Sequence, residues 1–470
     1  MSGLYSSINA TVKAITAHSR AIEIAGKNLA NVNNPEYARQ RVVFGDRGTV
    51  ITPQGAESLG IEALAVQQLR DALLDRQVMR EVGLRSAFAA EQQGYQRAQA
   101  GLGQSIDRTS GAAEAGAVGN AGLSAAIDGF FNSFQSFAAR PTDDGERQTL
   151  LQKAGILTDR FQLTDSRLAQ VQTDLNSQIG DDVAGINRLL GTIAELNSQI
   201  GRFEINAPGT AIDLRDQRQA RLEELAAKMP VEIRDTPTGQ VEVVAKDAGG
   251  SDIVLVNLAV VQGTVAFTGT QITAGSGATP VALSSGSIKG ALTARDGAVQ
   301  TLRDDLDKLA QQFVTSVNTA YNPAGTSGNF FNATGTTAGS ISLVNTLTAA
   351  TLKASDGGPA GDNAVALAVA QLATQAFSVS GGDQIDGTFS GFFGKTVSKL
   401  GQALAGANAR VEDQNNIERL IRSQRDSVSG VSLDEEVADL MKFQRAFQAS
   451  SRVFNVLDEL LDLVVNRLGT

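Results

Sequence analysis

The side chains that most often perform chemistry are scarce in this chain. It has no cysteine and one histidine, His18, so it offers no thiolate nucleophile and no histidine-rich metal site. One acidic cluster, Asp143, Asp144 and Glu146, follows Pro141 and is the best candidate for binding a cation. An Asp-Gly step inside the cluster is typical of a loop that enters a helix, and we interpret it in that way.

Two glycine-rich segments have features of ligand-binding loops but lack the necessary context. Residues 381–387 hold one copy of a pattern that binds calcium only in stacked repeats, so a turn is the favoured interpretation. Residues 101–103 lack the preceding strand of a nucleotide-binding loop and predict a helix break. We therefore predict no catalytic residue, metal or cofactor, and interpret His18 as a surface or interface residue. A secreted hydrolase is the least favoured function.

Length and composition indicate a multidomain protein. The chain has 470 residues, which corresponds to about three domains of roughly 150 residues each. Its net charge of -10 disfavours nucleic acid as a partner. No run of about 18 apolar residues predicts a membrane span, and the first thirty residues lack the apolar core of a cleaved signal peptide. We expect a soluble protein, or one exported by a route that needs no cleaved signal.

The strongest pattern is a heptad repeat at each end of the chain. Near the C-terminus, Ser432 and Glu435 have the spacing of a reciprocal helix cap and place the helix start near residue 432. Near the N-terminus, Asn33, Asn34 and Pro35 predict the end of the first helix. The ten apolar heptad positions, here called the assembly seam, are Ile8, Ile15, Ile22, Leu29, Leu433, Leu440, Phe447, Phe454, Leu461 and Leu468.

The two terminal helices are suited to pair with each other. Residues 1–50 carry six basic and three acidic groups, a charge of +3, whereas residues 410–470 carry eight basic and eleven acidic groups, a charge of -3. One interpretation is that both helices pack within the core of a monomer. The other is a terminal coiled coil that also packs against neighbouring copies, and the strict sevenfold spacing favours it modestly.

The interior predicts further helices and one β-region. Helical stripes occupy residues 64–100, 150–175, 186–203 and 302–317, and the alanine-rich residues 363–377 favour a helix. Alternating apolar residues and turn signals predict strands over residues 231–284. The fold class is thus mainly α with inserted β: a discontinuous α+β multidomain chain with a terminal coiled coil, an elongated helical bundle and a small outer β-domain. The predicted domains are 1–45 with 412–470, 46–230 with 285–411 (including Gly/Thr-rich loops at 322–362), and 231–284.

Both ends of the chain resemble the flagellar rod, hook and hook-associated proteins. That family carries a signature of the form A-N-x-x-T-P-G-Y after its first helix, and this chain departs from it at Asn34 and Glu36. The segments 430–436 and 443–449 are similar to the C-terminal helix of the same family. The residues that match the first signature or extend it are Asn31, Asn33, Pro35, Tyr37 and Arg39.

The interior resembles the hook–filament junction members of that family. The similar segments are residues 130–134, 139–141, 193–197, 213–218, 317–331 and 361–363. The resemblance implies a non-enzymatic structural protein that self-assembles as a ring at the junction of the extracellular flagellum, exported without a cleaved signal peptide. It implies as partners other copies of the chain, hook protein, a second junction protein (hook-associated protein 3) and a cytoplasmic export chaperone on the C-terminal helix, with no nucleic acid and no membrane.

Two alternatives stay open beside that function. A flagellar hook or distal-rod protein would share the terminal helices but have a mostly β interior. A cytoplasmic coiled-coil scaffold would share the heptads but be absent from sheared flagella.

Overall fold

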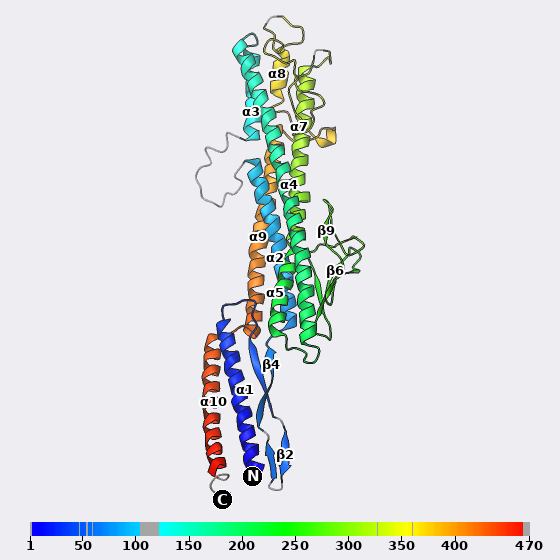
Figure 1. Ribbon diagram of the computed structural model, residues 1–470. Coiled ribbons are helices and arrows are strands. Elements are labelled where there is room, and N and C mark those ends of the chain that lie inside the picture. Colours follow the sequence, from blue (N-terminus) through cyan, green and yellow to red (C-terminus); the bar gives the residue numbers. More distant parts are fainter. Residues whose placement is uncertain are drawn as a thin grey trace. The chain divides into compact units, whose positions relative to one another are not determined.

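The computed structural model describes residues 2–46, 48–52, 55–58, 60–103, 122–326, 328–359 and 361–463. These residues form a mainly helical protein with small antiparallel sheets, which confirms the predicted fold class (Figure 1). The helices are α1 (Ser2–Ala30), α2 (Ala72–Leu102), α3 (Leu123–Ala139), α4 (Asp144–Phe203), α5 (Ile212–Lys228), α6 (Ser287–Ala294), α7 (Gln300–Tyr321), α8 (Ala364–Gln371), α9 (Phe389–Ser429) and α10 (Leu433–Asp462). The strands are β1 (Gln40–Asp46), β2 (Thr49–Thr52), β3 (Gly55–Ser58), β4 (Ile61–Gln68), β5 (Glu232–Asp235), β6 (Val241–Lys246), β7 (Asp252–Asn257), β8 (Val260–Val261), β9 (Ala266–Phe267), β10 (Ile272–Ala274) and β11 (Thr279–Pro280). Among the described helices, none combines the length and apolar character needed to cross a membrane.

The chain divides into two compact units. Unit 1 comprises residues 1–85, 183–286 and 414–470, and unit 2 comprises residues 86–182 and 287–413. This division differs from the predicted partition, because the β-region 231–284 clusters with the two chain ends and the predicted bundle is shared between the units. The independent folding of the three predicted parts remains a prediction.

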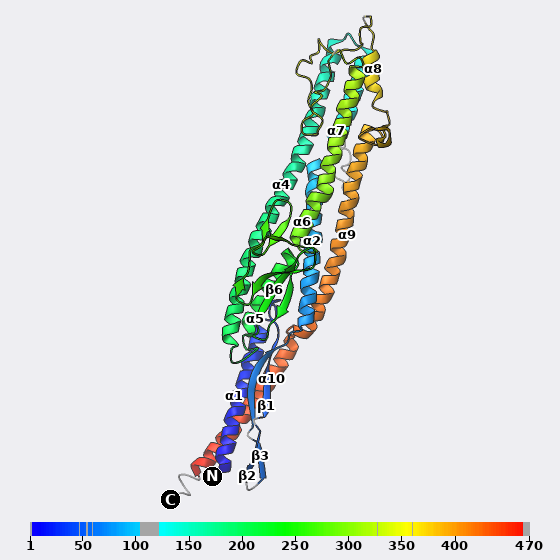
Figure 2. The same ribbon diagram turned by 90° about the vertical axis from the view of Figure 1, so that its right-hand side faces the viewer.

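Within unit 1, α1 packs on α10 and on the ribbon formed by β1 and β4 (Figures 1 and 2). The helices run antiparallel, with Asn28 near the end of α1 bonded to Glu436 near the start of α10. α1 ends at Ala30, as the Asn33–Pro35 signal predicts. α10 begins after Ser432, but the predicted reciprocal cap is wrong: the Ser432 side chain makes no cap bond, and the Glu435 carboxylate is paired with Arg39.

The β1–β4 ribbon replaces part of a predicted helix. The helical pattern predicted for residues 64–100 is correct only from Ala72 onward, since residues 61–68 form β4. The strands pair antiparallel, with Val42 opposite Val66 and Asp46 opposite Ile61, and a register shift between Val43 and Phe44. Pairing with β1 and packing on α1 are tertiary contacts, and these override a weak local preference.

The predicted β-region is present in unit 1. Its larger sheet has the order β5-β6-β7-β8, and the expected first hairpin pairs Ile233 with Val243. Asn197 of α4 anchors this sheet: its side chain donates to the carbonyl of Val241 at 2.7 Å and accepts from the Val241 amide at 3.2 Å. Arg218 of α5 donates to the same Asn197 side chain at 2.9 Å. Buried asparagine and arginine groups thereby satisfy one another.

Unit 2 is built around a cluster of phenylalanine rings. Phe130 of α3 is fully buried, and its ring centroid lies 5.2 Å from that of Phe313 of α7. Asn318, five residues further along α7, accepts hydrogen bonds from the amides of Phe330 and Phe331 at 3.0 and 2.8 Å. The loop after α7 is therefore held by a helix side chain that places two more rings in the core.

The structure bears on five smaller expectations. The stripes at 150–175 and 186–203 belong to one 60-residue helix, α4. Asp143 accepts from the amides of Gly145 and Glu146 at the start of α4, as expected for a loop entering a helix. In the segment 381–387, a turn at Gly382 follows a short 3-10 helix (Val379–Gly381), and bends lead to Gly387. α2 ends at Leu102 before Gly103, as the predicted helix break requires. The alanine-rich helix is shorter than predicted, because Phe377 pairs with Gly387 in a bridge.

Candidate functional site at the turn after α1

The family signature folds into a compact turn in unit 1. The backbone amide of Asn34 donates to the carbonyl of Asn31 at 2.9 Å, and the amide of Glu36 donates to the side chain of Asn34 at 3.1 Å. Positive φ at non-glycine residues of the described chain occurs only at Leu258 and Ala278, so Glu36 occupies an ordinary conformation. The two departures from the signature are therefore accommodated by an asparagine-stabilised turn.

Asn28, in the last turn of α1, connects this turn to β1. Its side-chain oxygen accepts from the hydroxyl of Tyr37 at 2.7 Å and from the amide of Gln40 at 3.0 Å. Its side-chain nitrogen donates to the carbonyl of Gln40 at 2.8 Å and to Glu436 at 2.9 Å. Burial next to Asp213, Asp216 and Glu436 raises the pKa of the Tyr37 phenol. Tyr37 therefore remains a hydrogen-bond donor throughout the physiological range.

Arg39 connects the same turn to α10. Its guanidinium lies 2.6 Å from Glu435 and 2.6 Å from Glu436, and 3.8 Å from Asp439. Its backbone amide donates to the carbonyl of Ser429, the last residue of α9, at 2.9 Å. The side chain and backbone of one residue thus hold both sides of the break between α9 and α10.

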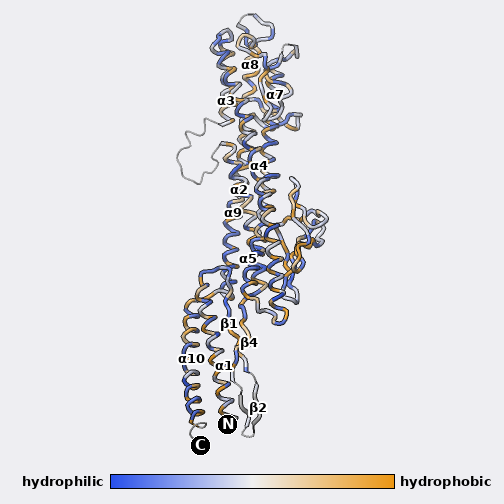
Figure 3. The backbone as a smooth tube through the Cα atoms, in the orientation of Figure 1, coloured by the Kyte–Doolittle hydropathy of each residue, from blue (hydrophilic) through white to orange (hydrophobic). Residues whose placement is uncertain are grey.

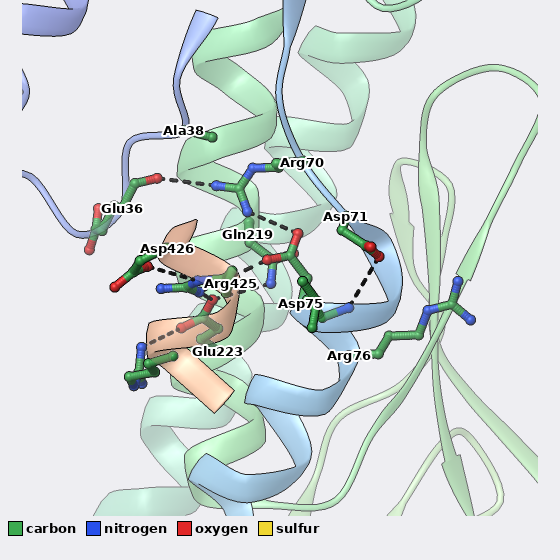
Figure 4. Close-up of polar contacts among 12 residues, drawn as sticks. Glu36, Ala38, Arg70, Asp71, Asp75, Arg76, Gln219, Glu223, Arg425 and Asp426 are labelled. Atoms are coloured by element: carbon green, nitrogen blue, oxygen red, sulfur yellow. Dashed lines mark hydrogen bonds and ion pairs between the residues drawn. The ribbon is translucent and has the colours of Figure 1, made fainter. Parts of the chain in front are cut away.

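Arg70 ties the turn to α5 and α2 (Figure 4). Its guanidinium lies 2.7 Å from Asp216 and 3.0 Å from Asp75, and it donates to the carbonyl of Glu36 at 3.1 Å. Burial raises the pKa values of Asp75 and Asp216, and the charge of Arg70 opposes that shift. A buried arginine held by two carboxylates and a carbonyl fixes the relative positions of these segments.

Arg425 near the end of α9 extends this ionic cluster. Figure 4 shows its side chain directed toward Glu223 of α5 and Asp75 of α2, at 2.7 and 3.9 Å. Glu223 also pairs with Arg422 at 3.4 Å, and Arg422 with Glu418 at 2.7 Å. Acidic and basic side chains therefore alternate across α2, α5 and α9.

The turn and the α9–α10 break enclose a groove of about 500 Å³ lined by residues 31–35, 37–39, Arg70, 425–432 and Glu435. Its lining contains no histidine or cysteine, and the described residues contain no cluster of three or more acidic, histidine or cysteine side chains able to hold a metal ion. Gly430 closes the break, because a Cβ there would collide with the carbonyl oxygen of Asp426. The bonds described above position α1 and α10 on either side of this groove.

The assembly seam lies along the α1–α10 pair. Its residues are half-buried, apart from Leu433, which is 53% exposed at the first residue of α10, and Leu468, which lies outside the described residues. Figure 3 shows hydrophobic and hydrophilic residues interspersed along both helices. α1 and α10 pack together in antiparallel orientation, and direct contact between the two halves of the seam remains a prediction. Its use in assembly is a proposal.

The signature residues have unequal roles in the structure. Tyr37 and Arg39 join the polar network, and Asn31 donates to the carbonyl of Lys27 at 2.9 Å, whereas Asn33 and Pro35 are exposed. The sequence does not predict the other polar residues of this network, namely Asn28, Arg70, Asp75, Asp216, Glu223, Arg425 and Glu436. For Asn28, the sequence does carry one signal: it is a polar residue within the apolar pattern of the first helix, and such a residue can specify how two helices pair.

The chain matches two models of protein families. The flagellar hook-associated protein FlgK helical domain matches residues 115–334, and the flagellar basal body rod FlgEFG protein C-terminal model matches residues 422–468, which include Arg425, Glu435 and Glu436. The flagellar hook-associated protein 1 of Bacillus subtilis is 24% identical, covering 100% of this chain and 99% of that protein. The protein of the same name from Escherichia coli is 23% identical, covering 98% and 99%.

A solved structure shares the fold. The flagellar hook junction protein FlgK from Burkholderia pseudomallei aligns with a TM-score of 0.62 at 15% identity, covering 75% of this chain and 100% of that one. These matches define the class of the chain as a protein of the flagellar rod and hook-associated type. Within that class, the chain is similar over its full length to proteins named flagellar hook-associated protein 1, which agrees with the resemblance of its motifs.

Proposed function

We propose that this chain is a structural subunit of the bacterial flagellum that self-assembles as the junction ring between hook and filament. The observation that carries this proposal is the apolar surface of the α1–α10 pair. A helix pair with many exposed apolar side chains is typical of a surface that another chain buries. The exposed apolar residues are Tyr5, Val12, Leu433, Val437, Met441, Val453, Val456 and Leu460.

The same surface supports the proposed partners. In the flagellum, neighbouring copies would bury it laterally, with hook protein on one side of the ring and the second junction protein, hook-associated protein 3, on the other. Before export, a cytoplasmic chaperone would shield α10, because exposed apolar surface promotes unwanted association. We further propose export to the extracellular flagellum without a cleaved signal peptide. The role is structural and involves no catalysis.

Electron microscopy of a strain that lacks this protein tests the proposal. We expect intact bare hooks, with filament subunits lost to the medium, and restored filaments when the gene is supplied again. Filaments attached to hooks without the protein would contradict the junction function. Absence of the hooks themselves would favour the hook or distal-rod alternative. Presence of the protein only in the cytosol, and never in sheared flagella, would favour the scaffold alternative.

A further inference from the structure

α10 is attached to unit 1 in an unusual way. Among the described residues of α10, the one fully buried side chain is a carboxylate, Glu436, which is 3% exposed. The apolar seam residues of α10 are at most half-buried. Burying an acidic group is unfavourable unless it is paired and hydrogen-bonded, so its position must be specified by its partners. Those partners are Arg39 at 2.6 Å and Asn28 at 2.9 Å.

The apolar seam alone leaves the alignment of the two helices ambiguous. Ile8, Ile15, Ile22 and Leu29 recur every seven residues, and so do Leu440, Phe447, Phe454 and Leu461. A slip of seven residues, about 10 Å along the helix axis, would bring large apolar side chains opposite one another again. Hydrophobic contact therefore discriminates weakly between the two registers. A unique buried polar pair is a well-known device for removing such an ambiguity.

Asn28 and Glu436 form such a pair. Asn28 is 1% exposed, and both atoms of its amide are bonded, to Tyr37, Gln40 and Glu436. A slipped α10 would separate the Glu436 carboxylate from Arg39 and remove one bond from the Asn28 side-chain nitrogen. The slipped register would thus leave a buried donor and a charge incompletely satisfied, whereas the observed register satisfies both.

We propose that Asn28 and Glu436 are positioning residues that set the register of α10 on α1. In the structural subunit proposed above, this register determines the positions along the helix pair at which the outward apolar side chains of α10 are presented for assembly. The relevance to assembly rests on the proposed function, but the register itself is a property of the single chain and can be measured without flagella.

The absence of cysteine permits a direct measurement in the full chain. Spin labels on Thr16→Cys and Asp458→Cys, two exposed positions of α1 and α10, report the helix alignment by double electron–electron resonance. These positions are offset by about 15 Å along the antiparallel pair, so an axial slip changes the distance between the labels. We expect one narrow distance distribution in the parent. The variant Asn28→Leu/Glu436→Leu should give a broad distribution, or a second distance from a population displaced by about 10 Å along the axis. Circular dichroism must show that the variant is folded.

The leucine substitutions distinguish a register set by the buried polar pair from a register set by apolar contacts alone. They add hydrophobic surface to the helix pair, so an apolar account predicts an equally narrow or narrower distribution. A single unchanged distance would show that the turn after α1 and the α9–α10 break fix the register unaided, and would overturn the proposal. If the leucine variant is unfolded, Asn28→Ala with the same labels provides the test, with the same two outcomes.

A matched control removes a different polar pair of α1. Lys27, the residue before Asn28, forms an ion pair at 2.8 Å with Asp213 of α5. Lys27→Gln/Asp213→Asn should leave the distance distribution narrow and centred on the parent value. A similar broadening in this control would mean that any polar loss at the end of α1 disturbs α10, which would also overturn the specific assignment. A register change together with normal filaments would instead contradict only the link to assembly.

Discussion

His18 lies on α1 with its ring centroid 6.2 Å from that of Phe44, whose ring in turn lies 5.9 Å from that of Phe443 of α10. Its Nδ1 atom is buried and lacks a hydrogen-bond partner among the described residues. Burial lowers the pKa of the imidazole below its ordinary value of 6.5. Between the lowered pKa of the folded state and the pKa of 6.5 of the unfolded state, the unfolded chain binds more protons at His18 than the folded chain. Burial of the neutral His18 ring therefore contributes its full share of the folding stability above pH 6.5, and this share is lost as the pH falls through the lowered pKa.

A proton NMR titration can measure this directly, because the chain has one histidine. We expect the midpoint of the His18 ring resonance below 6.5 in the folded chain and near 6.5 in denaturant. In His18→Gln, the free energy of unfolding should fall less steeply as the pH is lowered. The buried carboxyls of Asp75 and Asp216 have raised pKa values, so they favour the folded state as the pH falls and oppose the effect of His18. A folded midpoint at or above 6.5 would contradict the burial argument.

Asn197 offers a second prediction at the scale of one residue. It is fully buried and bonds Val241, Leu258 and Arg218. Asn197→Ala should lower the free energy of unfolding by about 3 kcal/mol, because it leaves a buried arginine and backbone groups unsatisfied. Urea unfolding followed by circular dichroism would show this, with Glu195→Ala, an exposed position on the same helix, as a near-neutral control. Equal stability of the two variants would contradict this role.

Residue-level inference from the sequence succeeds where the cause is local and fails where it is tertiary. Asn33, Asn34 and Pro35 end a helix by their own backbone preferences, and α1 ends at Ala30 as expected. Ser432 and Glu435 have the right spacing for a cap, but Glu435 is captured by Arg39, which is far away in the sequence. The buried pairs of Arg70 and Arg425 likewise depend on side chains that only the fold brings together.

At the scale of elements, the terminal helices can be tested by placing a charge in the seam. Phe447 is half-buried on α10, and Phe447→Asp would place a carboxylate against apolar side chains at a cost of about 2 kcal/mol or more. We expect the variant to be absent from isolated hook–filament junctions while unit 2 melts normally. Gln444→Asp, an exposed position on the same helix, is the matched control. Normal incorporation of the phenylalanine variant would contradict the role of the seam.

The helices and strands, too, can be predicted from the sequence where their cause is local, and not where it is tertiary. Long helices such as α4 and α7 carry repeated apolar spacing, and the first hairpin of the β-region carries alternating residues with a clear turn, so both were expected from the sequence. β1 and β4 were not expected, because Ile61–Gln68 includes alanine and glutamine and gains its strand character from pairing with residues 40–46. The alanine-rich segment ends its helix early for a similar reason, since Phe377 packs on Phe389 with ring centroids 4.8 Å apart.

At the scale of the whole molecule, the distribution of burial predicts an uneven local stability. α7 contributes eleven buried residues to unit 2, including Leu306, Phe313 and Val317, whereas the described part of α10 contributes only Glu436. Local opening costs less free energy where fewer apolar contacts must be broken. In dilute solution, the amides of α10 should therefore exchange with solvent about tenfold faster or more than those of α7.

Assembly should remove this difference if neighbouring copies bury the outward apolar side chains of α10. Hydrogen exchange measured by mass spectrometry on the purified chain and on isolated junctions compares the two states in the same peptides. Peptides of α7 provide the internal control, because their protection comes from the core of unit 2 and should be similar in both samples. Equal protection of α10 and α7 in the isolated chain would mean that the half-buried seam already suffices, and that order in α10 does not await polymerisation.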